Sequence, residues 1–114
     1  MTFFKDLDTI MKQDFGNRGL LKELPDNPIR ETLTALTLAR RVILLTGFPV
    51  RLSDGSFVGE TDGPLGTADI AAALTALGAS VLVITDEPAF SIVSDVVCYR
   101  APKAKLMMLP KTDT

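Results

Sequence analysis

Two acidic residues that can move protons, Glu60 and Asp62, stand in a glycine-rich stretch that runs from residue 46 to residue 68. An apolar run at 42–45 precedes this stretch, and an Ala/Leu-rich run at 68–77 follows it. Strand, loop and helix in this order outline a ligand site in an open α/β sheet, where ligands lie beyond the carboxyl ends of the strands. The connection of about 20 residues is long for such a unit, whose loops usually hold about 2–6 residues. We therefore expect a functional site in this stretch.

The chemistry open to the chain is limited because the sequence contains no histidine. A nucleophile paired with histidine, an imidazole base and a histidine-containing zinc site are all excluded. Proton transfer must use carboxylates, lysine, tyrosine or water.

One interpretation makes Glu60 and Asp62 acid/base groups and ammonium acceptors for a small amino acid. The start of the following helix, expected at residues 66–68, would then hold the carboxylate of that amino acid through its backbone N–H groups. Arg51 or Arg18 would supply the pairing cation.

Two other interpretations stay open on the residues alone. Glu60 and Asp62 could hold a divalent metal ion together with Asp54 or Asp86, because oxygen ligands suit Mg²⁺, Mn²⁺ and Ca²⁺. The stretch could also bind a nucleotide, a dinucleotide or S-adenosylmethionine. Its glycines do not follow the G-x-G-x-x-G spacing and it contains no lysine, but Asp86 follows Gly66 by about 20 residues, as a ribose-binding acid would.

Apolar periodicity and turn residues predict the elements that must position this stretch. We expect helices at about 3–14, 28–39, 67–77 and 88–94, the second begun by Asn27-Pro28 and the third capped by Thr67 and ended by Gly78. We expect strands at 41–46, 80–85 and 95–100, with 105–109 as either a fourth strand or an interface segment. The single cysteine, Cys98, is then expected to be a buried strand thiol.

These elements predict one small α/β domain over residues 1–114, of the Rossmann-like three-layer type. Its three- or four-stranded sheet should be mainly parallel, because the β-loop-α-β core at about 41–100 forms a right-handed crossover. A helical segment at about 1–39 precedes that core.

Composition limits the partners of the chain. Its 114 residues carry 12 basic and 14 acidic side chains without a basic patch, so we expect no nucleic acid. No apolar run reaches the roughly 18 residues of a membrane span, and the acidic N-terminus does not resemble a signal peptide. We therefore expect a cytoplasmic protein, since one cysteine also fits a reducing compartment. The hydrophobic content of 46% suggests a homo-oligomer.

Three segments carry a family resemblance: Thr46-Gly-Phe-Pro-Val50, Gly59-Glu-Thr-Asp-Gly-Pro-Leu-Gly66 and Val83-Ile-Thr-Asp-Glu87, with Asn17-Arg-Gly19 ahead of them. Over about residues 14–87 the chain resembles the D-glutamate cyclase C-terminal domain family. The resemblance implies an α/β fold and a lyase that converts D-glutamate to 5-oxo-D-proline with loss of water. We predict no cofactor, with a divalent metal ion as the open alternative. A non-catalytic remnant of the family, which binds a small molecule or oligomerises, is the alternative.

The resemblance places site residues at Thr46, Gly47, Glu60, Thr61, Asp62 and Gly63. With the residue-based reasoning above, we predict Glu60 and Asp62 as the catalytic pair. The predicted substrate-binding residues are Thr46, Gly47, Arg51, Thr61, Gly63, Gly66, Thr67 and Arg18, and no residue is assigned to a metal ion.

Overall fold

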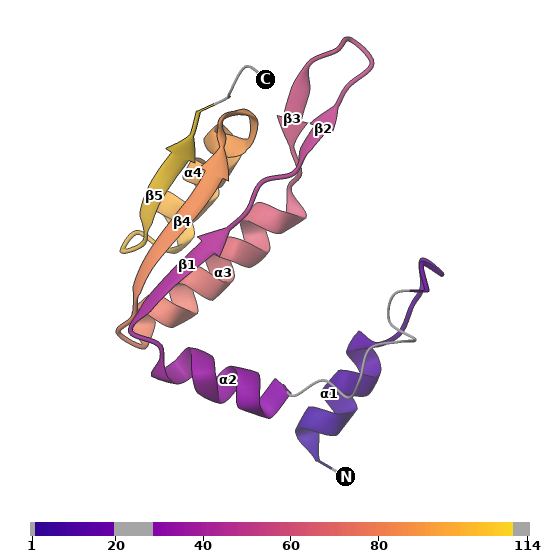
Figure 1. Ribbon diagram of the computed structural model, residues 1–114, viewed down its shortest axis with the longest axis vertical. Helices are drawn as coiled ribbons and strands as arrows, with labels where there is room; N and C mark the ends of the chain where they lie inside the picture. The colour runs from indigo at the N-terminus through magenta and orange to yellow at the C-terminus, as the bar shows by residue number, and fades with distance from the viewer. Residues whose placement is uncertain (1, 20–28, 111–114) are drawn as a thin grey trace. The chain divides into compact units, whose positions relative to one another are not determined.

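A computed structural model of the protein describes residues 2–19 and 29–110. The chain divides into two compact units, residues 1–38 and residues 39–114 (Figure 1). The helix start expected at Asn27-Pro28 lies outside the described residues.

The first unit contains two helices, α1 (Phe3–Met11) and α2 (Ile29–Leu38). Both fall inside the ranges expected from helical spacing, although α1 ends three residues before the predicted residue 14. Within the described residues neither helix buries a side chain. After α1 the chain turns around Asp14, whose carboxylate accepts hydrogen bonds from the backbone N–H groups of Arg18 and Gly19 at 3.1 and 2.8 Å.

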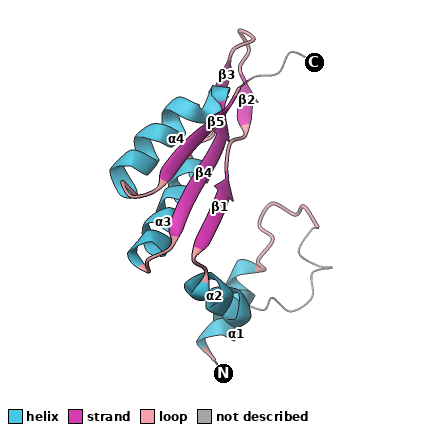
Figure 2. Ribbon diagram, turned by 60° about the vertical axis from the view of Figure 1, so that its left-hand side comes forward, coloured by secondary structure: helices cyan, strands magenta, loops and turns pink. Residues whose placement is uncertain are grey.

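The second unit is built on a parallel sheet in the order β1 (Arg41–Leu45), β4 (Ser80–Asp86) and β5 (Lys105–Leu109) (Figure 2). Leu45 pairs with Ile84, and Ile84 with Met107, so the strands end at one edge of the sheet. This confirms the predicted α/β class with a mainly parallel sheet. It also decides that residues 105–109 form a strand.

Helices α3 (Asp62–Ala76) and α4 (Glu87–Arg100) both cover the same face of this sheet (Figures 1 and 2). Alternate residues of β4 point towards these two helices, into the layer between helices and sheet, because successive strand side chains face opposite sides. Small side chains make up most of that layer, which lets the helices approach closely. The buried apolar residues are Ala68, Ala71, Leu74, Ala79, Val81, Val83, Ala89, Val93, Val97 and Ala101.

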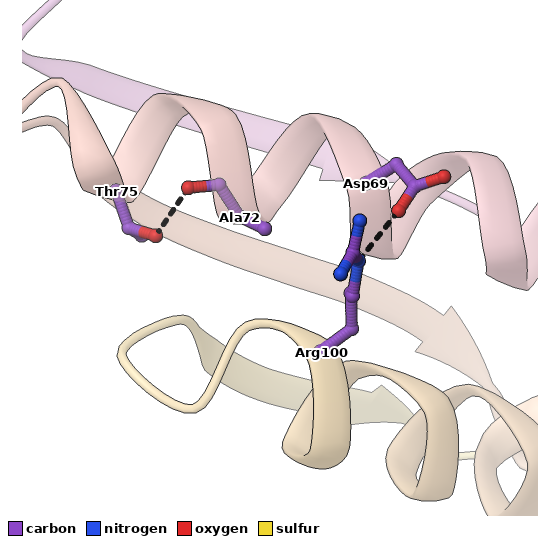
Figure 3. A network of polar contacts seen from close by, with 4 residues as sticks. All are labelled: Asp69, Ala72, Thr75 and Arg100. Atoms are coloured by element: carbon purple, nitrogen blue, oxygen red, sulfur yellow. Dashed lines mark hydrogen bonds and ion pairs between the residues drawn. The ribbon is translucent and has the colours of Figure 1, made fainter.

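An ion pair ties α3 to the end of α4. Arg100 Nε donates to Asp69 Oδ1 at 2.8 Å across the two helices (Figure 3). Six residues further along α3, the Thr75 hydroxyl donates to the carbonyl of Ala72 at 3.1 Å and to that of Ala71 at 2.8 Å. Thr75 therefore satisfies its polar group within its own helix and is not available to a ligand.

The opposite face of the sheet is apolar and open within residues 39–110. Ile43, Leu45, Met107 and Leu109 are 63%, 76%, 42% and 49% exposed. Parallel sheets are usually covered on both faces. The described helices of this unit thus supply one of the two helical layers that the predicted three-layer arrangement requires.

The long connection after β1 contains an antiparallel hairpin that the sequence reasoning missed. Strands β2 (Pro49–Arg51) and β3 (Phe57–Gly59) pair across a tight turn. In that turn Asp54 Oδ1 accepts from the backbone N–H and the hydroxyl of Ser56 at 2.9 and 2.6 Å.

The strand predicted at 95–100 is wrong, because α4 continues through these residues to Arg100. Its buried side chains Ala89, Val93 and Val97 recur every four residues, which is a helical spacing. Cys98 consequently lies on the exposed side of a helix and is not the buried strand thiol that we expected. None of the described helices is long and apolar enough to cross a membrane.

Candidate functional site

A hollow of about 400 Å³ lies where the parallel strands end. We call it the strand-end hollow, and its lining consists of Leu45, Thr46, Gly47, Phe48, Pro49, Ile84, Thr85, Asp86 and Leu109. This is the edge at which ligands bind in open α/β sheets, because the chain leaves neighbouring strands there in loops that can surround a small molecule. Apolar side chains line part of it, and its polar side chains are Thr46, which follows β1, and Thr85 and Asp86 at the end of β4.

The turn after β1 brings the backbone close to the polar end of β4. The N–H of Thr46 still donates to the Ile84 carbonyl at 3.0 Å, and the chain then turns away with φ values of 143° at Gly47 and 153° at Phe48. A β-carbon on Gly47 would lie 3.2 Å from Asp86 Oδ1 and 3.4 Å from Thr85 Oγ1. Only glycine fits this approach without strain.

Phe48 adopts the same rare region of φ although it carries a large side chain, which is 69% exposed. Such backbone conformations cost on the order of 1–3 kcal/mol and cluster at functional sites. The turn between β1 and β2 is therefore a candidate functional segment.

Asp86 closes β4 and begins α4. Its Oδ1 accepts from the backbone N–H of Ala89 at 3.2 Å and so caps the helix. Among the residues described as lining the strand-end hollow, Asp86 is the one that carries a charge. The charged side chain in the described lining is therefore a carboxylate that also caps a helix.

Thr85 is 1% exposed, and its hydroxyl oxygen has no hydrogen-bond partner within the described part of the chain. A buried polar group without a partner costs about 1–3 kcal/mol. It lies beside the Gly47 backbone, and with the strained turn it gives the end of β4 two costly features in one place.

The start of α3 faces the end of β1. Helix α3 begins at Asp62, so the start that we expected at residues 66–68 is wrong by four to six residues. Pro64 is tolerated there because N–H groups of a first turn have no partner within the helix. Thr61 stands at the N-cap without a side-chain hydrogen bond, and Asp62 Oδ1 instead accepts from the N–H of Gly63 at 2.9 Å.

The predicted residues Thr46 and Gly63 do come together. A β-carbon on Gly63 would lie 3.4 Å from Thr46 Oγ1, which is close contact. Gly66 and Thr67 fall inside α3 rather than at its start. They therefore offer no N–H groups to a ligand, because those groups bond within the helix.

Glu60 and Asp62 are both exposed, and neither belongs to the described lining of the strand-end hollow. The backbone N–H of Glu60 donates to the Phe48 carbonyl at 3.4 Å, so the segment before α3 runs beside the strained turn. Among the described residues, these two predicted catalytic carboxylates are therefore not enclosed.

The two predicted cations lie elsewhere. Arg51 is exposed on β2 of the hairpin and is not among the described residues that line the hollow. Arg18 belongs to the unit formed by residues 1–38. Within the described ranges, no group of three or more carboxylate or cysteine side chains is arranged to hold a metal ion.

Comparison with known proteins assigns the chain to a family. The family model described as "D-glutamate cyclase-like, C-terminal" matches residues 7–113. The chain belongs to this family. The human protein "D-glutamate cyclase, mitochondrial" is 32% identical over 93 residues, which cover 82% of this chain. The match spans 15% of the length of the human protein. No solved structure matches the chain.

Three of the lining residues that the sequence did not predict as site residues carry the features described above in this D-glutamate cyclase-like chain: Phe48, Thr85 and Asp86. Asp86 was interpreted as a metal ligand, a ribose-binding acid or an acid at the start of a helix, and Phe48 and Thr85 stood only within the segments that carry the family resemblance. All three follow the carboxyl end of a predicted parallel strand or form its last position. That placement was the available signal, since such ends meet at one edge of the sheet.

Proposed function

We propose that the chain binds a small acidic amino acid at the carboxyl ends of β1 and β4 and closes it to its 5-oxo lactam, with D-glutamate as the substrate. Membership of the D-glutamate cyclase-like family supports the reaction class. The observation that carries the location is the strained turn at Gly47 and Phe48, which lies against Asp86.

The reaction needs positioning and proton transfer but no outside reagent. The substrate amine forms a bond to its own γ-carboxyl carbon, and one carboxyl oxygen leaves as water. The two protons of that water come from the substrate ammonium group, so protons and electrons balance. Holding the chain of the substrate folded contributes through orientation, because an intramolecular attack needs the reacting atoms to be close.

Glu60 and Asp62 are the proposed groups that carry these protons from the amine to the leaving oxygen. Their support is that the segment carrying them runs beside Phe48 and enters the first turn of α3. A substrate carboxylate at that turn would take the place of the Asp62 oxygen on the N–H of Gly63. Asp62 would then be released for proton transfer.

The test is an assay of the purified chain with D-glutamate and, separately, L-glutamate, in which 5-oxoproline is followed by mass spectrometry. Glu60→Gln and Asp62→Asn should each abolish formation of the product, whereas Asp54→Asn at the hairpin turn should leave it intact. Product from neither isomer, in a protein that melts cooperatively, would reject the lyase.

A binding module without catalysis is the second candidate, and the exposure of Glu60 and Asp62 favours it. The chain also spans only 15% of the human relative, so the reaction of the whole relative needs its own demonstration here. Saturable binding of D-glutamate without formation of 5-oxoproline would establish this alternative.

We also propose self-association and a cytoplasmic location. The open apolar face that carries Ile43 and Leu45 supports the first. The single cysteine, Cys98, is compatible with the second, although the human relative is named mitochondrial. Light scattering after size-exclusion chromatography and fractionation of the source cells test the two statements.

A further inference from the structure

We propose that a second copy of the chain covers the open face of the parallel sheet, and that the partner's Arg41 and the partner's Lys105 complete the strand-end hollow. This inference rests on the proposed function for its substrate, D-glutamate, and it gives the proposed self-association a definite geometry. It also provides the hollow with cations, which its own described lining lacks.

Strand register arranges the residues of the open face in three rows across the sheet. Residues two apart on a strand share a face, so the rows follow from the pairing of β1, β4 and β5. The first row is Ile43, Leu82 and Lys105, the second is Leu45, Ile84 and Met107, and the third is Asp86 and Leu109. Arg41 precedes the first row on β1 by two residues. The middle of this face is therefore apolar, and charged residues stand at its two ends.

The charges at the two ends differ in sign. Arg41 and Lys105 begin β1 and β5, are exposed, and form no ion pair within the described residues. Asp86 lies at the other end, where one of its carboxylate oxygens caps α4 and the second can still accept from a cation. The rows of Lys105 and Leu109 are about 13 Å apart, at about 3.3 Å per strand residue. One end of the face thus carries cations and the other a carboxylate.

These charges decide how a second copy can cover the face. Packed sheets lie about 10 Å apart with their strands nearly aligned, so a two-fold axis between them runs either along the strands or across them. An axis along the strands would set the cations of one copy against the same cations of the other, and such like-charge contacts are unfavourable. An axis across the strands at Ile84 reverses the partner and lays its first row over the third. The partner's Lys105 then faces Leu109, beside Asp86.

The reversed arrangement brings cations to the strand-end hollow. Leu109 belongs both to the open face and to the lining of the hollow, so a side chain that faces Leu109 also faces the hollow. D-Glutamate carries two carboxylates, and charge-assisted hydrogen bonds from lysine or arginine are strong carboxylate contacts. Arg51 and Arg18 are not among the described lining residues. The partner's Arg41 and the partner's Lys105 take that role, and the two-fold axis repeats it in the second hollow.

The interface is tested by the oligomeric state of the protein. Light scattering after size-exclusion chromatography should find a dimer of the wild-type chain. Ile43→Asp places a charge on the open face outside the described lining of the hollow, and it should give a monomer that still melts cooperatively. Met107→Asp serves in its place if that variant does not fold. Ile70→Asp is the matched control and should leave the dimer intact, because Ile70 is exposed on α3, which covers the other face of the sheet.

The shared site is tested by mixing two inactive variants. The double variant Arg41→Gln, Lys105→Gln lacks the cations, and Glu60→Gln lacks a proposed proton carrier, so neither alone should form 5-oxoproline from D-glutamate. When both are unfolded together and refolded, about half of the dimers are mixed and hold one intact site, so activity should return to about a quarter of the wild-type value. A mixture of Glu60→Gln with Asp62→Asn is the control and should stay inactive, because both changes lie in the same copy's part of the site.

A monomeric wild-type protein, or a dimer that neither Ile43→Asp nor Met107→Asp separates, would overturn the interface. A mixture that stays inactive would overturn the partner's contribution, while activity of the wild-type protein keeps the proposed function. If wild-type protein forms no 5-oxoproline, the proposed function fails, and calorimetry with D-glutamate decides the partner's contribution. The Arg41→Gln, Lys105→Gln variant should then bind at least about tenfold more weakly than wild type. Equal binding, or no binding by wild-type protein, would overturn the shared site.

Discussion

Gly47 approaches Asp86 so closely that a β-carbon on the glycine would stand 3.2 Å from the carboxylate Oδ1. The contact joins the end of β1 to the start of α4, two places that are far apart in the sequence. It depends on a residue without a side chain and on a φ of 143°.

Replacing Gly47 by alanine should therefore lower both stability and affinity. We expect a loss of about 1–3 kcal/mol in the free energy of unfolding, because alanine is strained at this φ and displaces the Asp86 carboxylate. Urea denaturation measures it. Gly66→Ala is the control, since Gly66 lies within α3 and a β-carbon there would meet nothing within 4 Å. That change should stabilise the protein by about 0.5–1 kcal/mol. Equal effects of the two substitutions would contradict the prediction.

Gly59, at the end of β3, should tolerate a side chain equally poorly, for a different reason. A β-carbon there would lie 2.8 Å from Ile92 Cγ2 and 3.2 Å from Ala89 Cα. Gly59→Ala should cost about 1–3 kcal/mol through overpacking between the hairpin and α4. Adding Ile92→Ala should recover only part of this loss, because the contact with the Ala89 backbone remains. Thermal melting of the two variants and of Ile92→Ala alone tests the prediction, and full recovery would refute it.

The Arg100–Asp69 ion pair should contribute little to stability. The two side chains are 61% and 64% exposed, and exposed pairs typically give about 0.2–1 kcal/mol. A double-mutant cycle with Arg100→Gln and Asp69→Asn should give a coupling energy in that range, and the coupling should shrink in 1 M salt. A coupling that persists unchanged at high salt would mean that the pair is shielded from solvent in solution.

The hairpin turn should respond to acid. The hydroxyl of Ser56, and then its backbone N–H, hold the pKa of Asp54 below its ordinary value. A lowered pKa in the folded state means that the contribution of Asp54 to stability is present above the ordinary pKa of about 3.9. That contribution is lost as the pH falls through the lowered value.

Ser56→Ala should raise the Asp54 pKa towards its ordinary value, as followed by carbon NMR of the side-chain carboxyl. Ser53→Ala, on the other side of Asp54, is the matched control and should leave this pKa where it is. An identical titration of Asp54 in both variants would show that Ser56 is not the cause of the shift.

Two substitutions of Asp86 should distinguish the contribution of its capping hydrogen bond from that of its charge. Asp86→Ala removes the cap of α4 and should destabilise the protein by about 1 kcal/mol, whereas Asp86→Asn should cost much less. Chemical denaturation of the two variants measures the difference. Equal losses would mean that the charge of Asp86, and not its capping hydrogen bond, stabilises the fold.

The parallel sheet could be predicted because its strands are buried segments with a plain sequence signal. Residues 42–45 and 81–84 are continuously apolar, and a helix separates them. The same signal led to the wrong strand prediction at 95–100, because Val96 and Val97 are also residue types that favour strands. The four-residue recurrence of Ala89, Val93 and Val97, together with the cap at Asp86, was the stronger signal.

The site was less predictable than the sheet. Thr46 and Gly63 could be brought together from their motifs, because a strand end and a helix start adjoin in α/β units. The roles of Phe48 and Thr85 depend on a backbone angle and on a missing hydrogen bond. Neither property follows from residue type, so these residues emerged only from the structure.

The open face of the sheet and the strand-end hollow share Leu45 and Leu109. Any layer that covers this face therefore also forms a wall of the hollow. By thermodynamic reciprocity, a ligand that gains contact with such a layer must strengthen the attachment of the layer by the same factor. Ligand binding in the hollow and covering of the open sheet face would then be coupled, so that a measurement of either one would detect the other.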